Sequence, residues 1–285
     1  MAIRYDMHMH SSFSTDSDAP MQSMVETAAG LGLQGICFTE HMDLDYPDGY
    51  FPEDAKAFTS DPEAVNKEIL RLRQSLSKSG VSSSLWIGFG LEFGMQPHLA
   101  GTFHEIAVNS PLDFIVASQH LVDSLDPYYP ASWAEKDPEI VIGNYYQEML
   151  SNLKKMREWD TLAHMDYIIR YLPDRGSLVY DSMTIHSDII DEILRYVILE
   201  GKCLEVNTSG YKYGLGQPNP APSILKRYRE LGGELITIGS DAHAPGQIAF
   251  AYDEVCHLLL NLGFHSYCVF EKRRMREIQL SSISS

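Results

Sequence analysis

The chain has 285 residues, of which 44% are apolar and 21% are charged, and this is enough for one large α/β domain with a full core. We therefore expect a single domain over residues 1–285. The 39 acidic and 22 basic residues leave a formal net charge of −17. A surface this negative repels phosphate backbones, which excludes nucleic acid as an expected partner. A phosphate-bearing substrate would then need local cations that the side chains do not supply, and this points to bound metal.

The cysteines and the apolar runs indicate the compartment. Cys37, Cys203, Cys256 and Cys268 lie far apart and show no CxxC pairing, as in proteins that keep reduced cysteines in the core. The start of the chain shows no signal-peptide pattern, and no apolar run approaches the roughly 20 residues that cross a bilayer. We expect a cytoplasmic protein without a membrane partner.

Seven short β-rich runs alternate with helical patterns along the chain. Most are apolar without clean alternation, as in parallel strands covered on both faces. Strands are expected at Ile3–His8, Gly35–Thr39, Leu85–Glu92, Asp113–Ser118, Thr161–His164, Cys203–Asn207 and Leu235–Ser240. Helices are expected at Met21–Leu31, Val65–Leu76, Ile189–Leu199, Ser223–Leu231 and Asp253–Leu262. About seven βα units predict a closed parallel barrel rather than an open sheet.

Local signals mark the helix ends and two unusual connections. The spacing of Ser60 and Glu63 is that of a capping box, and glycines follow the expected helices. The connections 42–60 and 121–140 are too long for ordinary βα loops and are rich in acids and aromatics. Because both follow expected strands directly, they should overhang the active face of the barrel. The tail after Arg273 is predicted to hold one more element, either a strand or a helix.

Side chains that bind metals recur at the carboxyl ends of the expected strands. In chain order they are His8, His10, His41, Glu92, His120, His164, Asp241 and His243. HxH and DxH at a strand end place both side chains on one face, because side chains repeat every two residues. The carboxyl ends of barrel strands form the rim where such enzymes keep their active sites. The joint occurrence predicts a metal centre, whereas His98, His104, His186 and His257 lack the pattern and are expected on the surface.

Taken together, HxH, TEH, GLE, a lone histidine, HxD and a final DxH resemble the PHP (polymerase and histidinol phosphatase) superfamily. The resemblance covers the chain from Asp6 to His243. It implies a distorted, TIM-like (β/α)7 barrel that holds three metal ions at the C-terminal ends of the strands. The segments AHMDYIIRYLP and EVNTSGY look like the stand-alone histidinol-phosphatases of histidine biosynthesis.

The resemblance also implies which residues hold which ion. The first ion would take His8, His10, Glu92 and Asp241, and the second would take Glu92 as a bridge with His120 and His164. The third would take Asp16, His41 and His243, with Asp18 as an alternative to Asp16. Asp166 could support a ligand from behind or be a simple loop acid.

Nitrogen and oxygen ligands without thiolate suit Zn²⁺, Mn²⁺ or Fe²⁺ alike. The resemblance implies hydrolysis of a small phosphate monoester by metal-activated hydroxide, with Asp241 and His243 as catalytic metal ligands. Arg170 resembles the arginine that contacts phosphate in the histidinol-phosphatases, and its planar fork matches two phosphate oxygens. The alternative for Arg170 is a surface position on a helix.

Histidinol phosphate also carries an ammonium group and an imidazole, which need acids or aromatic faces. We expect Asp43, Asp45 or Asp123, with Tyr46 and Tyr128, to supply them. Asn207 is expected to contact the substrate or to stabilise a turn.

Three other functions remain open from the sequence. They are another PHP phosphoesterase (a phosphotyrosine-protein or nucleotide phosphatase), an amidohydrolase-type deaminase, and an inactive binding protein. The sequence leaves the oligomeric state and the identity of the metals undecided.

Overall fold

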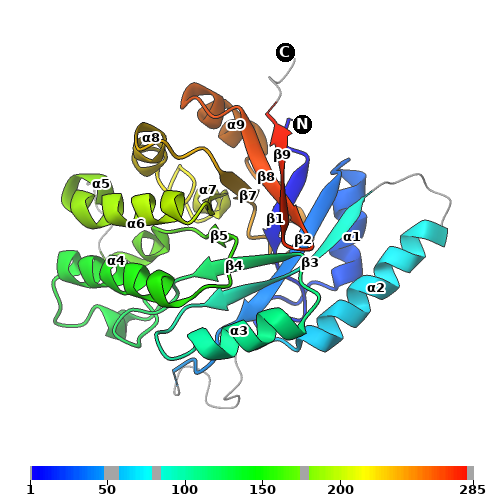
Figure 1. The fold of residues 1–285 in the computed structure, drawn as a ribbon, viewed down its shortest axis with the longest axis horizontal. Coiled ribbons are helices and arrows are strands. Elements are labelled where there is room, and N and C mark those ends of the chain that lie inside the picture. Colours follow the sequence, from blue (N-terminus) through cyan, green and yellow to red (C-terminus); the bar gives the residue numbers. More distant parts are fainter. Residues whose placement is uncertain (1, 48–57, 79–84, 174–179, 281–285) are drawn as a thin grey trace.

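The computed structural model describes residues 2–47, 58–78, 85–173 and 180–280 (Figure 1). Seven parallel strands run in sequential order through one sheet. They are β1 (Tyr5–Met9), β2 (Gly35–Met42), β3 (Trp86–Gly94), β4 (Phe114–Ser118), β5 (Thr161–Leu162), β6 (Cys203–Asn207) and β7 (Ile236–Gly239). All seven expected strands are therefore confirmed, and β5 is the shortest of them.

The two edges of this sheet meet just beyond β7. The Asp241 amide donates to the carbonyl of His8 and the His10 amide donates to the carbonyl of Ala242, each at 2.8 Å. Behind this seam, the buried Asp6 carboxylate accepts hydrogen bonds from the amide and the hydroxyl of Ser240, at 2.9 and 2.5 Å. The sheet thus forms a nearly closed, distorted barrel of the TIM type, as expected.

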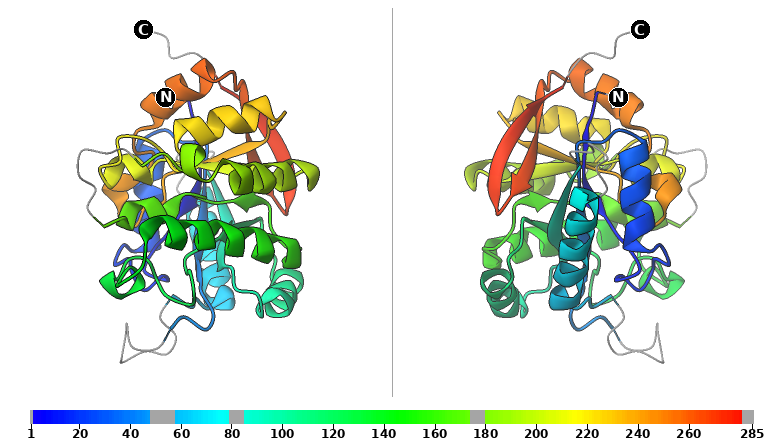
Figure 2. Two further views of the ribbon diagram at one scale, coloured as in Figure 1. Left: turned by 90° about the vertical axis from the view of Figure 1, so that its left-hand side faces the viewer. Right: turned by 90° about the vertical axis from the view of Figure 1, so that its right-hand side faces the viewer.

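Helices surround the outside of the barrel (Figure 2). The longer ones are α1 (Met21–Gly30), α2 (Pro62–Lys78), α3 (Ala100–Asn109), α4 (Pro138–Lys155), α6 (Ser187–Leu199), α8 (Pro222–Glu230) and α9 (Tyr252–Asn261). The short ones are α5 (Ser182–Ile185), α7 (Ser209–Lys212) and the 3₁₀ turns η1 (Pro130–Ser132), η2 (Tyr167–Tyr171) and η3 (Pro245–Gln247). In the part of the chain that the structure describes, no helix is both long and apolar enough to cross a bilayer.

The five expected helices are confirmed, but α3 and α4 were not foreseen. Phe103 is the one buried side chain of α3, so its apolar face is too narrow to give a helical period. In α4, glycine and β-branched residues interrupt the pattern, although Asp137 caps its start by accepting from the Glu139 amide at 2.9 Å.

The predicted capping box at Ser60 is wrong. Asp61 caps α2 instead, because its carboxylate accepts from the amides of Glu63 and Ala64 at 3.0 and 3.3 Å. The Ser60 hydroxyl donates to the carbonyl of Phe13 at 2.9 Å and so ties the residues just before α2 to the loop that follows β1.

The C-terminal tail forms the antiparallel hairpin β8 (Ser266–Glu271) and β9 (Arg274–Gln279), which covers the amino-terminal end of the barrel. In the turn of this hairpin, Arg273 pairs with Asp160, just before β5, at 2.5 and 2.9 Å. The ring centroids of Phe270 and Phe114 lie 5.1 Å apart. This end of the barrel is therefore closed. The undecided element after Arg273 is a strand.

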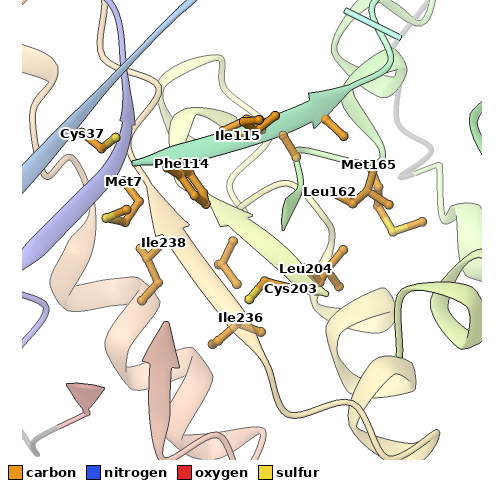
Figure 3. Close-up of a cluster of buried hydrophobic side chains, with 14 of the residues drawn as sticks. Met7, Cys37, Phe114, Ile115, Leu162, Met165, Cys203, Leu204, Ile236 and Ile238 are labelled. Atoms are coloured by element: carbon orange, nitrogen blue, oxygen red, sulfur yellow. The ribbon is translucent and has the colours of Figure 1, made fainter. Parts of the chain in front are cut away.

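The hydrophobic core continues around the strands, and Figure 3 shows one cluster of it with side chains of β1, β2, β4, β6 and β7. The inside of the barrel is narrow. A Cβ atom at Gly239 would lie 2.3 Å from Cβ of His8, and one at Gly90 would lie 2.9 Å from Cγ2 of Thr39. Across the interior, the hydroxyls of Thr161 and Thr237 are hydrogen-bonded at 2.8 Å. Small inward-facing residues therefore leave the carboxyl end as the place where large side chains can meet.

Gly239→Ala tests this crowding. Because the new methyl group would overlap the Cβ atom of His8, we expect the free energy of unfolding to fall by about 1–3 kcal/mol. Urea denaturation of chelator-treated protein would measure the change without a contribution from metal. The control is Gly101→Ala, in α3, where an added Cβ meets nothing within 4 Å. Equal stability of the two variants would mean that the barrel mouth has room to spare.

Candidate metal centre

The side chains expected to bind metal all converge at the carboxyl end of the barrel. His8 comes from β1, His41 from β2 and Glu92 from β3. The others follow β1, β4, β5 and β7 within four residues, except Asp16, which lies farther along the loop after β1. His8, His10 and Glu92 are at most 1% exposed. Two of the ligands expected here, His164 and Asp241, have positive φ angles of 24° and 52°, a backbone strain that is common at functional sites.

Four donor atoms form the first group. Nε2 of His8 lies 3.2 Å from Nε2 of His10, and these two atoms lie 3.4 and 3.5 Å from Oε2 of Glu92. Oδ1 of Asp241 lies 3.9 and 3.5 Å from the same two nitrogens. Bonds of about 2.1 Å to a tetrahedral ion would separate its ligands by about 3.4 Å. The group thus has the dimensions of one metal site.

The second group uses the other oxygen of Glu92. Its Oε1 lies 3.0 Å from Nε2 of His164 and 3.2 Å from Nε2 of His120. The two carboxylate oxygens therefore face two different sets of histidines. This arrangement is the one expected of a bridging carboxylate.

The third group surrounds Asp16. Its Oδ2 lies 2.9 Å from Nε2 of His243 and 3.4 Å from Nε2 of His41. Asp18 is exposed and makes no ion pair with any described residue, so the geometry favours Asp16 over Asp18. Nδ1 of His41 lies 3.0 Å from Oε2 of Glu92, so this ring also faces the other groups.

Two observations indicate that these residues fit metal ions. The buried atoms Oε2 of Glu92 and Nδ1 of His41 have no hydrogen-bond partner in the described structure. The ring of His10 stacks between those of His41 and His243, each at 4.3 Å. Burial, and then the neighbouring His243 and His41, lower the pKa of His10 to about 3, which keeps its imidazole neutral and able to bind metal. Nitrogen and carboxylate donors together suit divalent transition metals.

Buried acids hold two of these imidazoles from behind. Oε1 of Glu205 accepts a hydrogen bond from Nδ1 of His8 at 2.6 Å, and Oδ1 of Asp43 accepts one from Nδ1 of His120 at 2.7 Å. Each bond fixes the proton on Nδ1 and leaves the lone pair of Nε2 facing the donor group. Glu205 was missed from the sequence. An acid two residues before Asn207 in an otherwise apolar strand was the signal that could have revealed it.

A serine does the same for His10. The Ser14 hydroxyl donates to Oε2 of Glu40 at 2.6 Å and accepts from the amide of His41 at 3.1 Å. Its remaining contact, at 3.2 Å to Nδ1 of His10, must therefore be with a protonated nitrogen. Nε2 of His10 is again left as the donor to metal. Sequence reasoning also missed Ser14 and Glu40.

Arg170 lies in η2 and is 4% exposed, so the surface-helix alternative is wrong. Its Nε donates to Oδ1 of Asn219 at 3.3 Å, and its Nη2 donates to the hydroxyl of Ser209 and lies 3.5 Å from Oδ2 of Asp241. The guanidinium also lies over the rings of Tyr167 and Tyr213, at 5.0 and 4.7 Å from their centroids. It is therefore held rigidly beside the donor groups.

Asp166 supports this arginine indirectly. Its carboxylate accepts from Nδ2 of Asn219 at 2.6 Å and from the amide of Ala221 at 2.8 Å. Burial raises the pKa of Asp166 to about 6. The side chain thus orients Asn219, which in turn orients Arg170, and it is not a free loop acid.

Two expected substrate contacts are not where the sequence placed them. Asn207 is fully buried, and its amide is used by Ser209, at 3.0 and 2.5 Å, and by Glu205, at 3.1 Å. Asn207 thus supports the site from below. This excludes direct contact with substrate in this arrangement and agrees better with the expected structural role. Asp123 has a side chain 41% exposed, pairs with Lys136 at 3.3 Å and lies outside the cavity described next.

A cavity of about 520 Å³ opens over the donor groups. Arg170, seven of the nine donor residues and seven aromatic side chains line it. The aromatic ones are Tyr46, Phe58, Tyr128, Tyr129, Tyr167, Tyr171 and Tyr213. Asp43 and Asp126 also face it. Asp43 is engaged with His120, whereas Asp126 was not considered from the sequence. A second cavity, of about 700 Å³, lies at the β8–β9 hairpin and contains none of the donor residues.

The PHP domain family matches residues 6–209, and the chain belongs to this family. It is 32% identical to a protein of Clostridium acetobutylicum named "Probable histidinol-phosphatase", over 95% of this chain and 98% of the relative. It is 27% identical to the histidinol-phosphatase of Lactococcus lactis subsp. lactis, over 94% of each. The crystal structure of histidinol phosphate phosphatase from Lactococcus lactis, complexed with Zn, L-histidinol and phosphate, superposes with a TM-score of 0.83 at 25% identity. That superposition covers 96% of this chain and 98% of the other.

Metal content tests the sharing of Glu92. Glu92→Gln should remove metal from the first and second groups together, because one oxygen faces each. His41→Ala should mainly empty the third. Elemental analysis after gel filtration would give the ions per chain, with His98→Ala as control, since His98 is an exposed residue paired with Asp45. Equal losses from Glu92→Gln and His41→Ala would contradict the bridging assignment.

Proposed function

We propose that the protein is a metal-dependent histidinol-phosphatase, which hydrolyses L-histidinol phosphate to L-histidinol and phosphate in L-histidine biosynthesis. The observation that carries the proposal is the convergence of the expected donors beside a rigid, buried arginine. Similarity over nearly the full length to histidinol-phosphatases supports the substrate. The chain acts as a single catalytic domain over residues 1–285. The four cysteines are free and buried, which supports a cytoplasmic location.

The donor groups would hold three divalent ions, Zn, Mn or Fe. His8, His10, Glu92 and Asp241 would bind the first, Glu92, His120 and His164 the second, and Asp16, His41 and His243 the third. When bound, such ions supply positive charge to the phosphoryl oxygens and activate water at neutral pH. Three divalent ions against three carboxylates would leave a net charge of about +3, which suits a phosphate dianion.

Arg170 prepares the site for a phosphoryl group. Nη1 makes no hydrogen bond with any described residue, whereas Nε and Nη2 are held by Asn219 and Ser209. Two N–H groups therefore remain for phosphoryl oxygens, and the cation stays charged. Burial alone would lower the pKa of Arg170, but the neighbouring Asp241 raises it above its ordinary value. A fixed cation of this kind stabilises charge that develops on the phosphoryl oxygens.

The alternative functions differ in what they require of the site. Membership of the PHP domain family, with seven strands in the barrel, argues against an amidohydrolase-type deaminase. An inactive binding protein would have to keep eight of the nine donor residues buried or half-buried for no chemical purpose, at considerable cost. Another PHP phosphoesterase would differ only in the leaving group. A panel of histidinol phosphate, phosphotyrosine, AMP and single-stranded DNA decides between them. Equal or better phosphate release from phosphotyrosine or AMP would overturn the assignment.

Arg170→Ala tests the phosphate contact. We expect kcat/KM for histidinol phosphate to fall by ~10²-fold or more, equivalent to about 3 kcal/mol, because the charge is lost at the reacting group. Arg170→Lys should restore only part of the activity, because an ammonium group cannot keep the bonds to Asn219 and Ser209 and also present fixed N–H groups to phosphate. Metal content must stay at the wild-type level for the result to count as a phosphate effect. Wild-type kinetics in the Ala variant would remove Arg170 from the reaction.

A further inference from the structure

Asp126 is a buried acid of the cavity that lies within electrostatic range of His120 but forms no ion pair with it. Asp126 is only 8% exposed. Its carboxylate accepts hydrogen bonds from the hydroxyl of Tyr46 and from the amide of Tyr128, the latter at 2.8 Å. Within the described residues it forms no ion pair. The other acids that line the cavity, Asp16, Asp43, Glu92 and Asp241, all pair with imidazoles.

The remaining acids expected to recognise the leaving group are placed elsewhere. Asp45 is exposed and pairs with His98 at 3.0 Å, and Asp123 pairs with Lys136 outside the cavity. Asp43 accepts from His120 and lies 3.2 Å from His41, so both of its oxygens already face imidazoles of the donor groups. Asp126 is thus the one acid of the two long connections, among their described residues, that faces the cavity without a basic side chain as its direct partner.

Aromatic rings line the same cavity as Asp126, and two of the tyrosines donate hydrogen bonds to its carboxylate. The ring centroid of Tyr46 lies 5.0 Å from that of Phe58. The ring centroid of Tyr128 lies 5.0 and 5.6 Å from those of Tyr129 and Tyr171. Ring faces attract cations, and they do so with little dependence on the shape of the group that carries the charge. A carboxylate among such rings therefore selects for positive charge more strongly than for a particular ring or chain.

We propose that Asp126 selects the leaving group by pairing with an ammonium nitrogen of the substrate, and that the enzyme consequently hydrolyses phosphate monoesters of amino alcohols as a class. This inference rests on the proposed phosphatase function. In the reaction, the P–O bond to the alcohol breaks and water supplies both the oxygen that joins phosphorus and the proton that the alcohol takes up. The ammonium group is chemically unchanged. Its binding balances a carboxylate that is costly to bury alone.

The test compares two esters of similar size, phosphoethanolamine and ethyl phosphate, with histidinol phosphate as reference. Phosphate release by the wild-type holoenzyme gives kcat/KM for each. We expect phosphoethanolamine to be preferred over ethyl phosphate by at least about tenfold. Hydrolysis of histidinol phosphate without this preference would overturn the inference and leave the proposed function standing. No hydrolysis of histidinol phosphate would overturn the proposed function itself.

Asp126→Asn assigns the preference to one residue. The ratio of kcat/KM for the two esters should fall about tenfold, through a higher KM for phosphoethanolamine. Asp123→Asn, which removes the same charge three residues away and outside the cavity, should keep the wild-type ratio. If Asp126→Asn slows both esters equally, Asp126 has only a structural role and the inference is wrong. The wild-type comparison needs no variant, so it decides the class of substrate even if Asp126→Asn does not fold.

Discussion

The whole site depends on one buried carboxylate, that of Glu92, and on the two directions in which its oxygens point. Oε2 faces the pair of histidines at the end of β1, and Oε1 faces His120 and His164. Burial alone would raise the pKa of Glu92, but His8, His120 and His41 lower it well below its ordinary range. An ionised carboxylate at 1% exposure is stable only among cations, so the fold around it must supply them.

The narrow barrel makes this concentration of donors possible. At inward positions of β3 and β7, such as Gly90 and Gly239, the neighbouring atoms lie so close that only glycine fits. The space is used at the carboxyl end, where a layer of imidazoles and carboxylates meets. Behind that layer, Glu205, Asp43 and Ser14 each hold the Nδ1 proton of one histidine. Metal affinity therefore depends on residues that do not themselves belong to the donor groups.

In the proposed reaction, chemistry and substrate choice would come from different parts of the chain. The strands and their ends provide the donor groups, and η2 provides Arg170, all of them rigid. The two long connections provide Tyr46, Tyr128 and Asp126, which form the aromatic and acidic wall of the cavity. A relative with the same barrel could thus change its leaving group by changing those connections alone.

The sequence alone determined the strand count, the barrel and the candidate donors at the strand ends, because these depend on local periodicity and residue types, whereas Asp16 came from the family resemblance. The parallel order of the strands brings every carboxyl end to one rim, so positions far apart in sequence could be assigned to one site. Only the tertiary structure decided what faces the cavity from the long connections. The backbone path there turns Asp126 inward and Asp123 toward Lys136. It also decided that Asn207 lies beneath the site, since its side chain is fully buried and bonded to Ser209 and Glu205, outside the lining of the cavity. Such choices depend on contacts across the barrel, which no local pattern encodes.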